Sequence, residues 1–250
     1  MSATQKRRVL VVNDDGIYSP GIAALVRAAQ AFGEVRVVAP DVEQSSAGHA
    51  ITATRPVRTR ATRIFGDIEA FRVNGTPADC VALGAFQWGH VDVVLSGINL
   101  GPNLGNATWH SGTLAAAKQA ALLGIRGIAL SAPAGDEPED FSAIEPWVAK
   151  VLALLLDEED DPLLVNVNFP EHPRGIRWTC QEVAQYNGKV VPGTDPMGRE
   201  LFWFTVVPLT RHEEGSDLWA FEHGYVSLTP LRLDLTDYEA LNNADPDAVA

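Results

Sequence analysis

The first 40 residues alternate between short apolar runs and one amphipathic stretch, and this alternation constrains the fold more than any other feature of the chain. Residues 9–12 form an apolar run of the kind expected for a strand buried on both faces. From residue 19 to residue 33 apolar side chains recur at helical spacing, with Ser19 and Pro20 suited to begin a helix. A second apolar run follows at residues 35–39. The sequence therefore predicts a β-α-β unit, the building block of α/β folds.

The alternation continues along the chain. Residues 91–95, 127–131 and 163–167 predict further buried strands, and residues 113–123 and 146–156 predict helices. Two segments instead have the β-branched residues and turn signals of hairpins: residues 55–73 and residues 181–208, the latter around a turn at 193–198. We therefore expect an α/β fold with a mostly parallel sheet and a hairpin in the last third of the chain.

Composition narrows the classes of function. Among 250 residues, 32 are acidic and 19 are basic, a net charge of −13 that argues against binding long nucleic acid. No apolar run approaches the roughly 20 residues that a membrane span requires. The two cysteines, Cys80 and Cys180, are too few for a zinc site and predict reduced thiols in a cytoplasmic protein.

Two adjacent carboxylates, Asp14 and Asp15, follow the first predicted strand. Like charges about 4 Å apart repel by about 4 kcal/mol at an effective dielectric constant of about 20, unless a cation neutralises them. Hard oxygen ligands suit a divalent cation, and open α/β folds bind ligands at the carboxyl ends of their strands. The pair thus predicts a metal-dependent active site, although an Asp-Gly turn is the structural alternative.

Polar residues also follow the later strands. Asn99 offers an amide oxygen for a cation or an amide nitrogen for a phosphate. The Gly- and Asn-rich stretch that contains Asn103 could turn backbone N–H groups toward an anion, or it could be a flexible surface loop. The segment that follows the second predicted strand should lie beside the Asp14 loop, and Ser45 or Ser46 in it could add an oxygen ligand.

His110, Ser111, Gly112 and Thr113 precede an Ala-rich helix. Ser111 and Thr113 are good helix caps, and the same helix N-terminus could receive a phosphate without any basic side chain. His110 could act as a general acid or base, although a single His is more commonly a packing or hydrogen-bonding residue.

Taken in order, these motifs resemble the SurE (survival protein E) family of 5′/3′-nucleotidases, and the match runs from residue 9 to about residue 237. The matching segments are NDDG at 13–16, SPG at 19–21, APD at 39–41, QS at 44–45, GHAIT at 48–52, GTPADC at 75–80, SGIN at 96–99, NLG at 103–105, SGT at 111–113 and GYVSLTPL at 224–231. The chain departs from the family pattern at His110, where Tyr is more usual, and at residues 107–108 and 118–120.

The resemblance implies a divalent-metal-dependent phosphomonoesterase that hydrolyses nucleoside 5′- and 3′-monophosphates. It implies one Mg²⁺ or Mn²⁺ per subunit, and it assigns the metal ligands to Asp14, Asp15, Ser45 and Asn99. Asp14, Asp15 and Asn99 would be catalytic, and substrate phosphate would be bound by Asn13, Asn103, Ser111, Gly112 and Thr113.

The resemblance also implies a fold and an assembly. The fold would be a single domain over residues 1–250. Its Rossmann-like core of mostly parallel sheet flanked by helices would span about 8–180, and a C-terminal hairpin and extended arm about 181–250. Exchange of the arm between subunits would give a homodimer or homotetramer. The sequence Phe202-Trp203-Phe204 points the same way, because three consecutive large apolar residues cover both faces of a strand.

Two other functions are consistent with the residues. One is a phosphatase with Asp14 or Asp15 as nucleophile, although such sites generally separate their two Asp residues by one position. The other is a non-catalytic nucleotide-binding sensor.

Overall fold

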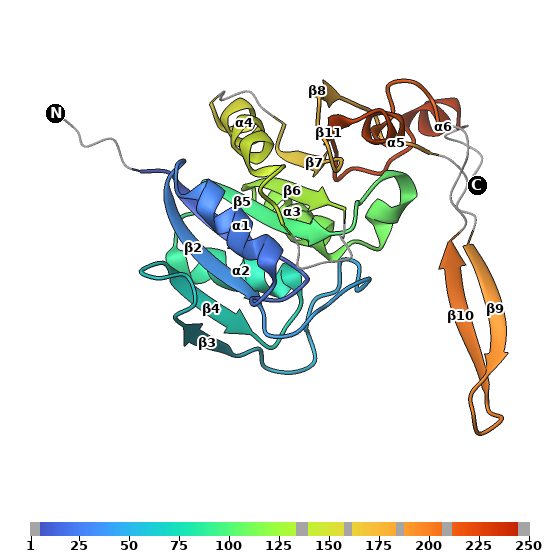
Figure 1. Ribbon diagram of the computed structural model, residues 1–250, viewed down its shortest axis with the longest axis horizontal. Helices are drawn as coiled ribbons and strands as arrows, with labels where there is room; N and C mark the ends of the chain where they lie inside the picture. The colour runs from blue at the N-terminus through green and yellow to red at the C-terminus, as the bar shows by residue number, and fades with distance from the viewer. Residues whose placement is uncertain (1–5, 134–139, 158–161, 184–187, 207–211, 245–250) are drawn as a thin grey trace.

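The computed structural model describes residues 6–133, 140–157, 162–183, 188–206 and 212–244 (Figure 1). Within these ranges, nine strands form one mixed sheet in the order β3-β4-β2-β1-β5-β6-β7-β11-β8. Their bounds are β1 Arg8–Val12, β2 Glu34–Pro40, β3 Thr59–Thr62, β4 Glu69–Val73, β5 Val93–Leu100, β6 Arg126–Ala132, β7 Leu164–Asn168, β8 Gly175–Trp178 and β11 Tyr225–Pro230. Neighbouring strands from β4 to β7 pair in parallel, so the predicted mostly parallel α/β sheet is confirmed.

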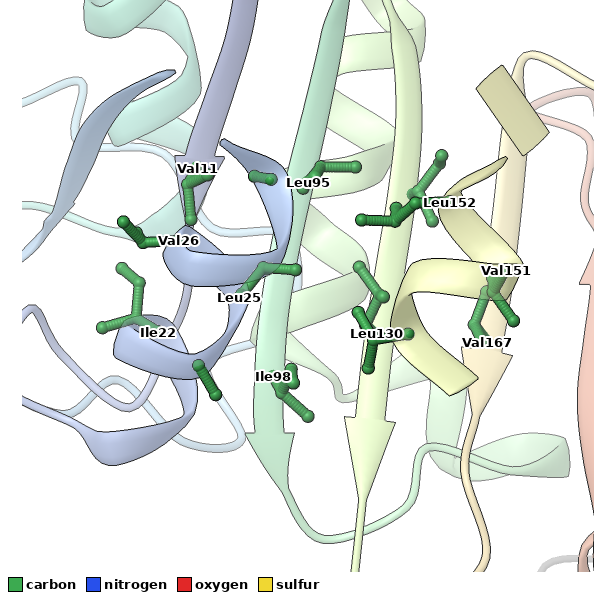
Figure 2. Close-up of a cluster of buried hydrophobic side chains, with 14 of the residues drawn as sticks. Val11, Ile22, Leu25, Val26, Leu95, Ile98, Leu130, Val151, Leu152 and Val167 are labelled. Atoms are coloured by element: carbon green, nitrogen blue, oxygen red, sulfur yellow. The ribbon is translucent and has the colours of Figure 1, made fainter. Parts of the chain in front are cut away.

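Helices cover both faces of the sheet. They are α1 Pro20–Ala29, α2 Pro77–Trp88, α3 Gly112–Leu122, α4 Glu145–Leu156, α5 Asp217–Glu222 and α6 Tyr238–Asn243, with a 3₁₀ turn η1 at Gly105–Trp109. Successive side chains of β1 point to opposite faces of the sheet, as the pleat of a strand requires. Val9 and Val11 pack in the cluster that α1 and α4 cover (Figure 2), whereas Leu10 and Val12 pack with residues of α2 and α3.

Close packing sets the position of α1. Ser19 caps this helix and accepts a hydrogen bond from the Ile22 N–H, as predicted. A Cβ on Gly21 would lie 2.0 Å from the Ile98 carbonyl oxygen of β5. Only glycine therefore lets the first turn of α1 lie directly against β5.

The observed bounds of several helices and strands differ from the predicted ones. The first helix ends at Ala29 rather than at Gly33, whose absent side chain instead makes room for the Arg7 carbonyl. The strand predicted at 91–95 starts at Val93 and continues to Leu100, because its pairing with β6 resumes at Asn99 after an irregularity. Residues 96–99 thus belong to a strand and not to a loop.

The last third of the chain contributes to the sheet as well as to the hairpin. Strand β11 lies between β7 and β8, so the expected limit of the core near residue 180 does not separate the sheet from the arm. The predicted hairpin is present as β9 Gly188–Thr194 and β10 Glu200–Val206, a separate antiparallel pair that extends away from the main sheet (Figure 1). Within the predicted 181–208 segment, residues 184–187 and 207–208 lie outside the described residues.

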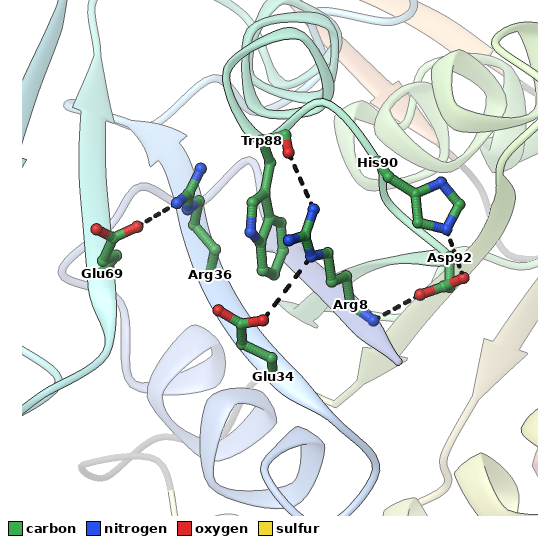
Figure 3. A network of polar contacts seen from close by, with 7 residues as sticks. All are labelled: Arg8, Glu34, Arg36, Glu69, Trp88, His90 and Asp92. Atoms are coloured by element: carbon green, nitrogen blue, oxygen red, sulfur yellow. Dashed lines mark hydrogen bonds and ion pairs between the residues drawn. The ribbon is translucent and has the colours of Figure 1, made fainter. Parts of the chain in front are cut away.

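A cluster of polar contacts lies at the amino-terminal ends of the central strands (Figure 3). The Arg8 N–H donates to Asp92 Oδ2 at 2.6 Å, and the Arg8 guanidinium donates to the Trp88 carbonyl at 3.2 Å. Arg36 pairs with Glu69 and lies over the Trp88 ring, 4.7 Å from its centroid. The candidate site lies at the opposite, carboxyl-terminal ends of these strands.

The two cysteines are free thiols, Cys80 buried and Cys180 exposed. Among the described residues, no helix has both the length and the apolar character needed to cross a membrane.

Candidate active site

Two neighbouring strands, β1 and β5, place the candidate residues together. The chain proceeds from β1 outward to β2 on one side and later returns to place β5 on the other side. In open α/β sheets, such a reversal of strand order creates a crevice at the carboxyl ends of the strands. Asp14 and Asp15 follow β1, Asn99 lies near the end of β5, and Asp15 Oδ2 accepts a hydrogen bond from the Leu100 N–H at 3.3 Å.

Asp14 is buried against the N-terminus of α3. Its side chain is 4% exposed, and its Oδ1 accepts a hydrogen bond of 2.6 Å from Thr113 Oγ1. A Cβ on Gly112 would lie 2.8 Å from Asp14 Oδ2, so only glycine allows the helix to approach this carboxylate so closely. The positive end of the helix dipole therefore faces Asp14.

Burial raises the pKa of Asp14, and the negative charge of Glu43 adds to the effect. Hydrogen bonds from the side chain and backbone of Thr113 act in the opposite direction but do not cancel it. The site thus holds a carboxylate that the protein alone does not fully stabilise as an anion.

The loop after β2 lies next to this pair, as predicted. The Gln44 N–H donates to the Asp14 carbonyl at 2.8 Å, and the adjacent Ser45 donates its hydroxyl to Glu43 Oε1 at 2.6 Å. Farther along the loop, the Gly48 N–H donates to the His110 carbonyl at 3.0 Å. The β2 loop therefore spans from the Asp pair to the segment before α3.

Asn99 is oriented by the loop that follows it. Its Nδ2 donates to the Gly101 carbonyl at 2.6 Å, and its Oδ1 has no hydrogen-bond partner among the described residues. The sequence left open whether the amide oxygen or nitrogen would serve the site, and this geometry favours the oxygen.

The predicted phosphate-binding residues differ in their surroundings. Ser111 caps α3 and accepts from the Leu114 N–H at 3.1 Å, whereas the hydroxyl of Thr113 faces Asp14. Asn13 is buried and donates from its Nδ2 to the Gly16 carbonyl and to Ser19 Oγ, each at 2.9 Å. Asn13 thus supports the turn that carries the Asp pair.

Asn103 lies in a buried polar network. Its Nδ2 donates to Ser131 Oγ at 2.8 Å, and its carbonyl accepts from Asn166 at 2.7 Å and Asn168 at 3.1 Å. Asn166 and Asn168 were not among the residues predicted for the site. Their signal was the insertion of two Asn residues into the otherwise apolar strand β7, where buried amides need fixed partners.

The donor set at the carboxyl edge fits a hard divalent cation. Among the described residues, no group of three or more His, Cys, Asp or Glu side chains could hold a metal ion, so the two carboxylates need neutral oxygens to complete a site. The open Oδ1 of Asn99 and the hydroxyl oxygen of Ser45 are such oxygens.

Comparisons with known proteins identify the family of the chain. Residues 9–188 match the family model described as "Survival protein SurE". The chain belongs to the SurE family. It is 50% identical over 234 residues to the 5′-nucleotidase SurE 1 of Thermus thermophilus, covering 92% of this chain and 93% of that protein. It is 46% identical to the 5′-nucleotidase SurE of Deinococcus radiodurans, covering 94% and 90% of the two chains.

A solved SurE structure has the same fold. The crystal structure of the SurE protein from Aquifex aeolicus superposes with a TM-score of 0.80 at 41% identity, covering 94% of this chain and 97% of that one. The fold and family implied by the sequence motifs are therefore confirmed.

Proposed function

We propose that this SurE protein is a divalent-metal-dependent nucleotidase that hydrolyses nucleoside 5′- and 3′-monophosphates to nucleoside and phosphate. One observation carries the proposal: at the switch point of the sheet, the buried Asp14 meets the N-terminus of α3 and the half-buried Asp15 meets the end of β5, so a candidate cation site adjoins a candidate anion site. The names of the curated relatives support the same class of activity.

Asp14, Asp15, Ser45 and Asn99 would hold one Mg²⁺ or Mn²⁺ per subunit. Such an ion, when bound, polarises a phosphoryl oxygen and lowers the pKa of a coordinated water.

The chain's own residues position the substrate. The N-terminus of α3, at Ser111 and Gly112, would receive the phosphate through backbone N–H groups and the helix dipole. Thr113 fixes the rotamer of Asp14 through its 2.6 Å hydrogen bond, and Asn13 and Asn103 hold the two loops in place. His110 is the candidate acid or base, because an imidazole can donate or accept a proton and this residue directly precedes Ser111 at the start of α3.

A nucleophilic Asp is less favoured by the surroundings of Asp14. Its carboxylate is almost fully buried and bonded to Thr113, whereas an attacking oxygen needs open space in line with the leaving group. We also propose a cytoplasmic location, because free thiols persist in reducing compartments.

A phosphate-release assay over nucleoside 5′- and 3′-monophosphates tests the proposal. Turnover is expected with Mg²⁺ or Mn²⁺ and is expected to be lost in excess chelator and in Asp15→Asn. Full activity in chelator would refute the role of the metal, and tight nucleotide binding without any phosphate release would indicate a sensor. Trapping of a phosphorylated Asp would establish the nucleophilic alternative.

A further inference from the structure

The connection between β5 and α3 carries Asn99 at one end and Ser111 at the other, so its conformation sets the distance between the two halves of the candidate site. Residues from the C-terminal part of the chain hold this connection at Gly105, the first residue of η1. We call residues 105–109 the site turn.

Asp217 is the centre of this attachment. Its side chain is fully buried, and its Oδ2 accepts from the Gly105 N–H at 2.8 Å. Its Oδ1 accepts from the Glu182 N–H at 3.0 Å and from the Leu218 N–H at 2.8 Å. One carboxylate therefore joins three segments that lie far apart in the sequence.

Gln181 completes the attachment from the other side of Gly105. Its Nε2 donates to the Gly105 carbonyl at 3.0 Å and to Thr108 Oγ1 at 3.1 Å. The fit is tight, because a Cβ on Gly105, whose φ is 50°, would lie 3.0 Å from the Glu182 carbonyl oxygen. Both backbone groups of Gly105 are thus bound by residues outside the site turn.

The same residues flank the hairpin in the sequence. Gln181 and Glu182 precede β9, and Asp217 follows β10. The two flanking segments are hydrogen-bonded to each other. The Asp217 N–H donates to the Cys180 carbonyl at 2.8 Å, and the Glu213 N–H donates to Glu182 Oε2 at 3.1 Å. The site turn is therefore attached to the segments that precede and follow the hairpin in the sequence, and not only to the sheet.

We propose that Asp217 is a positioning residue of the active site, which acts through Gly105 to hold the site turn and thereby the phosphate-binding Ser111. The inference rests on the proposed nucleotidase function. Asp217 touches no substrate atom in this scheme.

The energetics of Asp217 agree with a role beyond stability. Burial raises the pKa of Asp217, although hydrogen bonds from Gly105, Glu182 and Leu218 act to lower it. Keeping a buried carboxylate costs folding energy that an apolar residue would avoid. In return, the carboxylate fixes the position of the chain at Gly105.

The decisive variant is Asp217→Asn. It keeps the size of the side chain but turns an NH₂ group toward backbone donors, so Gly105 or Glu182 loses its acceptor. We expect kcat/KM to fall about tenfold to a hundredfold at a temperature where the variant is folded, since small displacements of positioned groups have effects of this size. The factor should be the same for every nucleotide, because the site turn leads to the phosphate site rather than to a base.

Asp92→Asn is the matched control. Asp92 also accepts a backbone hydrogen bond, from Arg8 at 2.6 Å, but at the opposite edge of the sheet. This variant should lower the melting temperature without changing kcat/KM. Equal kinetic losses in the two variants at matched stability would overturn the proposal.

Hydrogen exchange gives a readout that does not depend on activity. Peptides covering the site turn should exchange faster in Asp217→Asn than in the wild type, and unchanged exchange together with wild-type kinetics would overturn the proposal. If the wild type hydrolysed no nucleotide, the proposed function would fail while the exchange experiment still tested the attachment. Should Asp217→Asn not fold, Gln181→Met removes the bonds to Gly105 and Thr108 at similar volume and should show the same uniform loss.

Discussion

Asp14 shows the conflict between stability and chemistry at the scale of a single residue. Its carboxylate is buried, lies near Glu43, and has a raised pKa because of its desolvation. The helix dipole and Thr113 compensate only in part. Carboxylates perturbed in this way are typical of functional sites, and this makes Asp14 a candidate binding residue.

We therefore expect Asp14→Asn to abolish turnover and to raise the melting temperature in the presence of chelator. The amide can still accept from Thr113 but carries no charge to bury, and a gain of about 1 kcal/mol corresponds to about 2–4 °C for a chain of this size. Calorimetry with and without Mg²⁺ measures both effects. The wild type should gain stability on adding the ion, by about 2.7 kcal/mol at a hundredfold excess over Kd, and the variant should gain much less. Equal Mg²⁺ stabilisation of both proteins would exclude Asp14 as a ligand.

At the scale of elements, the N-terminus of α3 has two tasks that the sequence could not separate. Ser111 caps the helix, whereas Thr113 directs its hydroxyl to Asp14 from the first helical turn. Both residues were predicted to bind phosphate. In the structure, Ser111 accepts a hydrogen bond from the Leu114 N–H as the helix cap, whereas the Thr113 hydroxyl is bonded to Asp14.

Variants of these two residues should behave differently. Ser111→Ala should lower the free energy of unfolding by about 1 kcal/mol, as the loss of a helix cap does. It should also lower kcat/KM for all nucleotides. Thr76→Ala, which removes the analogous cap of α2, is the control and should change stability alone. Thr113→Val should reduce activity by freeing Asp14, and Thr113→Ser should restore it. Melting curves and steady-state kinetics distinguish these outcomes. Normal kinetics in Ser111→Ala would show that Ser111 caps the helix and has no role in turnover.

The elements were more predictable than the connections between them. Periodicity identified α1, α3, α4 and the central strands, because each of these must bury an apolar face. The continuation of β5 to Leu100 and the insertion of β11 depend on pairing with distant strands, which leaves no local signal. The same reason applies to the candidate site: motifs indicated Asp14, Asp15 and Asn99, whereas Asp217 became visible only through its contacts.

At the scale of the whole molecule, the hairpin lacks a partner surface on the part of the chain that the structure describes. Strands β9 and β10 pair only with each other, and Phe202, Trp203 and Phe204 are 58%, 65% and 86% exposed. A two-stranded ribbon alone is marginally stable in water. Exchange of identical arms between subunits would bury these side chains, and it remains our proposal for the assembly.

Light scattering at micromolar concentration should therefore give at least twice the monomer mass of 26.9 kDa. Replacing Phe202, Trp203 and Phe204 together by Ser should shift the mass toward the monomer. Phe86→Ser is the control, since Phe86 is 84% exposed on α2 and lies outside the hairpin. A monomeric wild type would refute the assembly, and an oligomer that survives deletion of residues 190–204 would remove the hairpin as its cause.

The attachment of Gly105 to Asp217 also sets an order of events during synthesis of the chain. A ribosome makes residues 8–132, which carry the Asp pair, Asn99 and the start of α3, long before it makes residue 217. Until then the Gly105 N–H lacks the carboxylate that accepts its hydrogen bond. A nascent chain can therefore form much of the parallel sheet while its candidate site still lacks this attachment, which forms only when the last third of the protein has emerged.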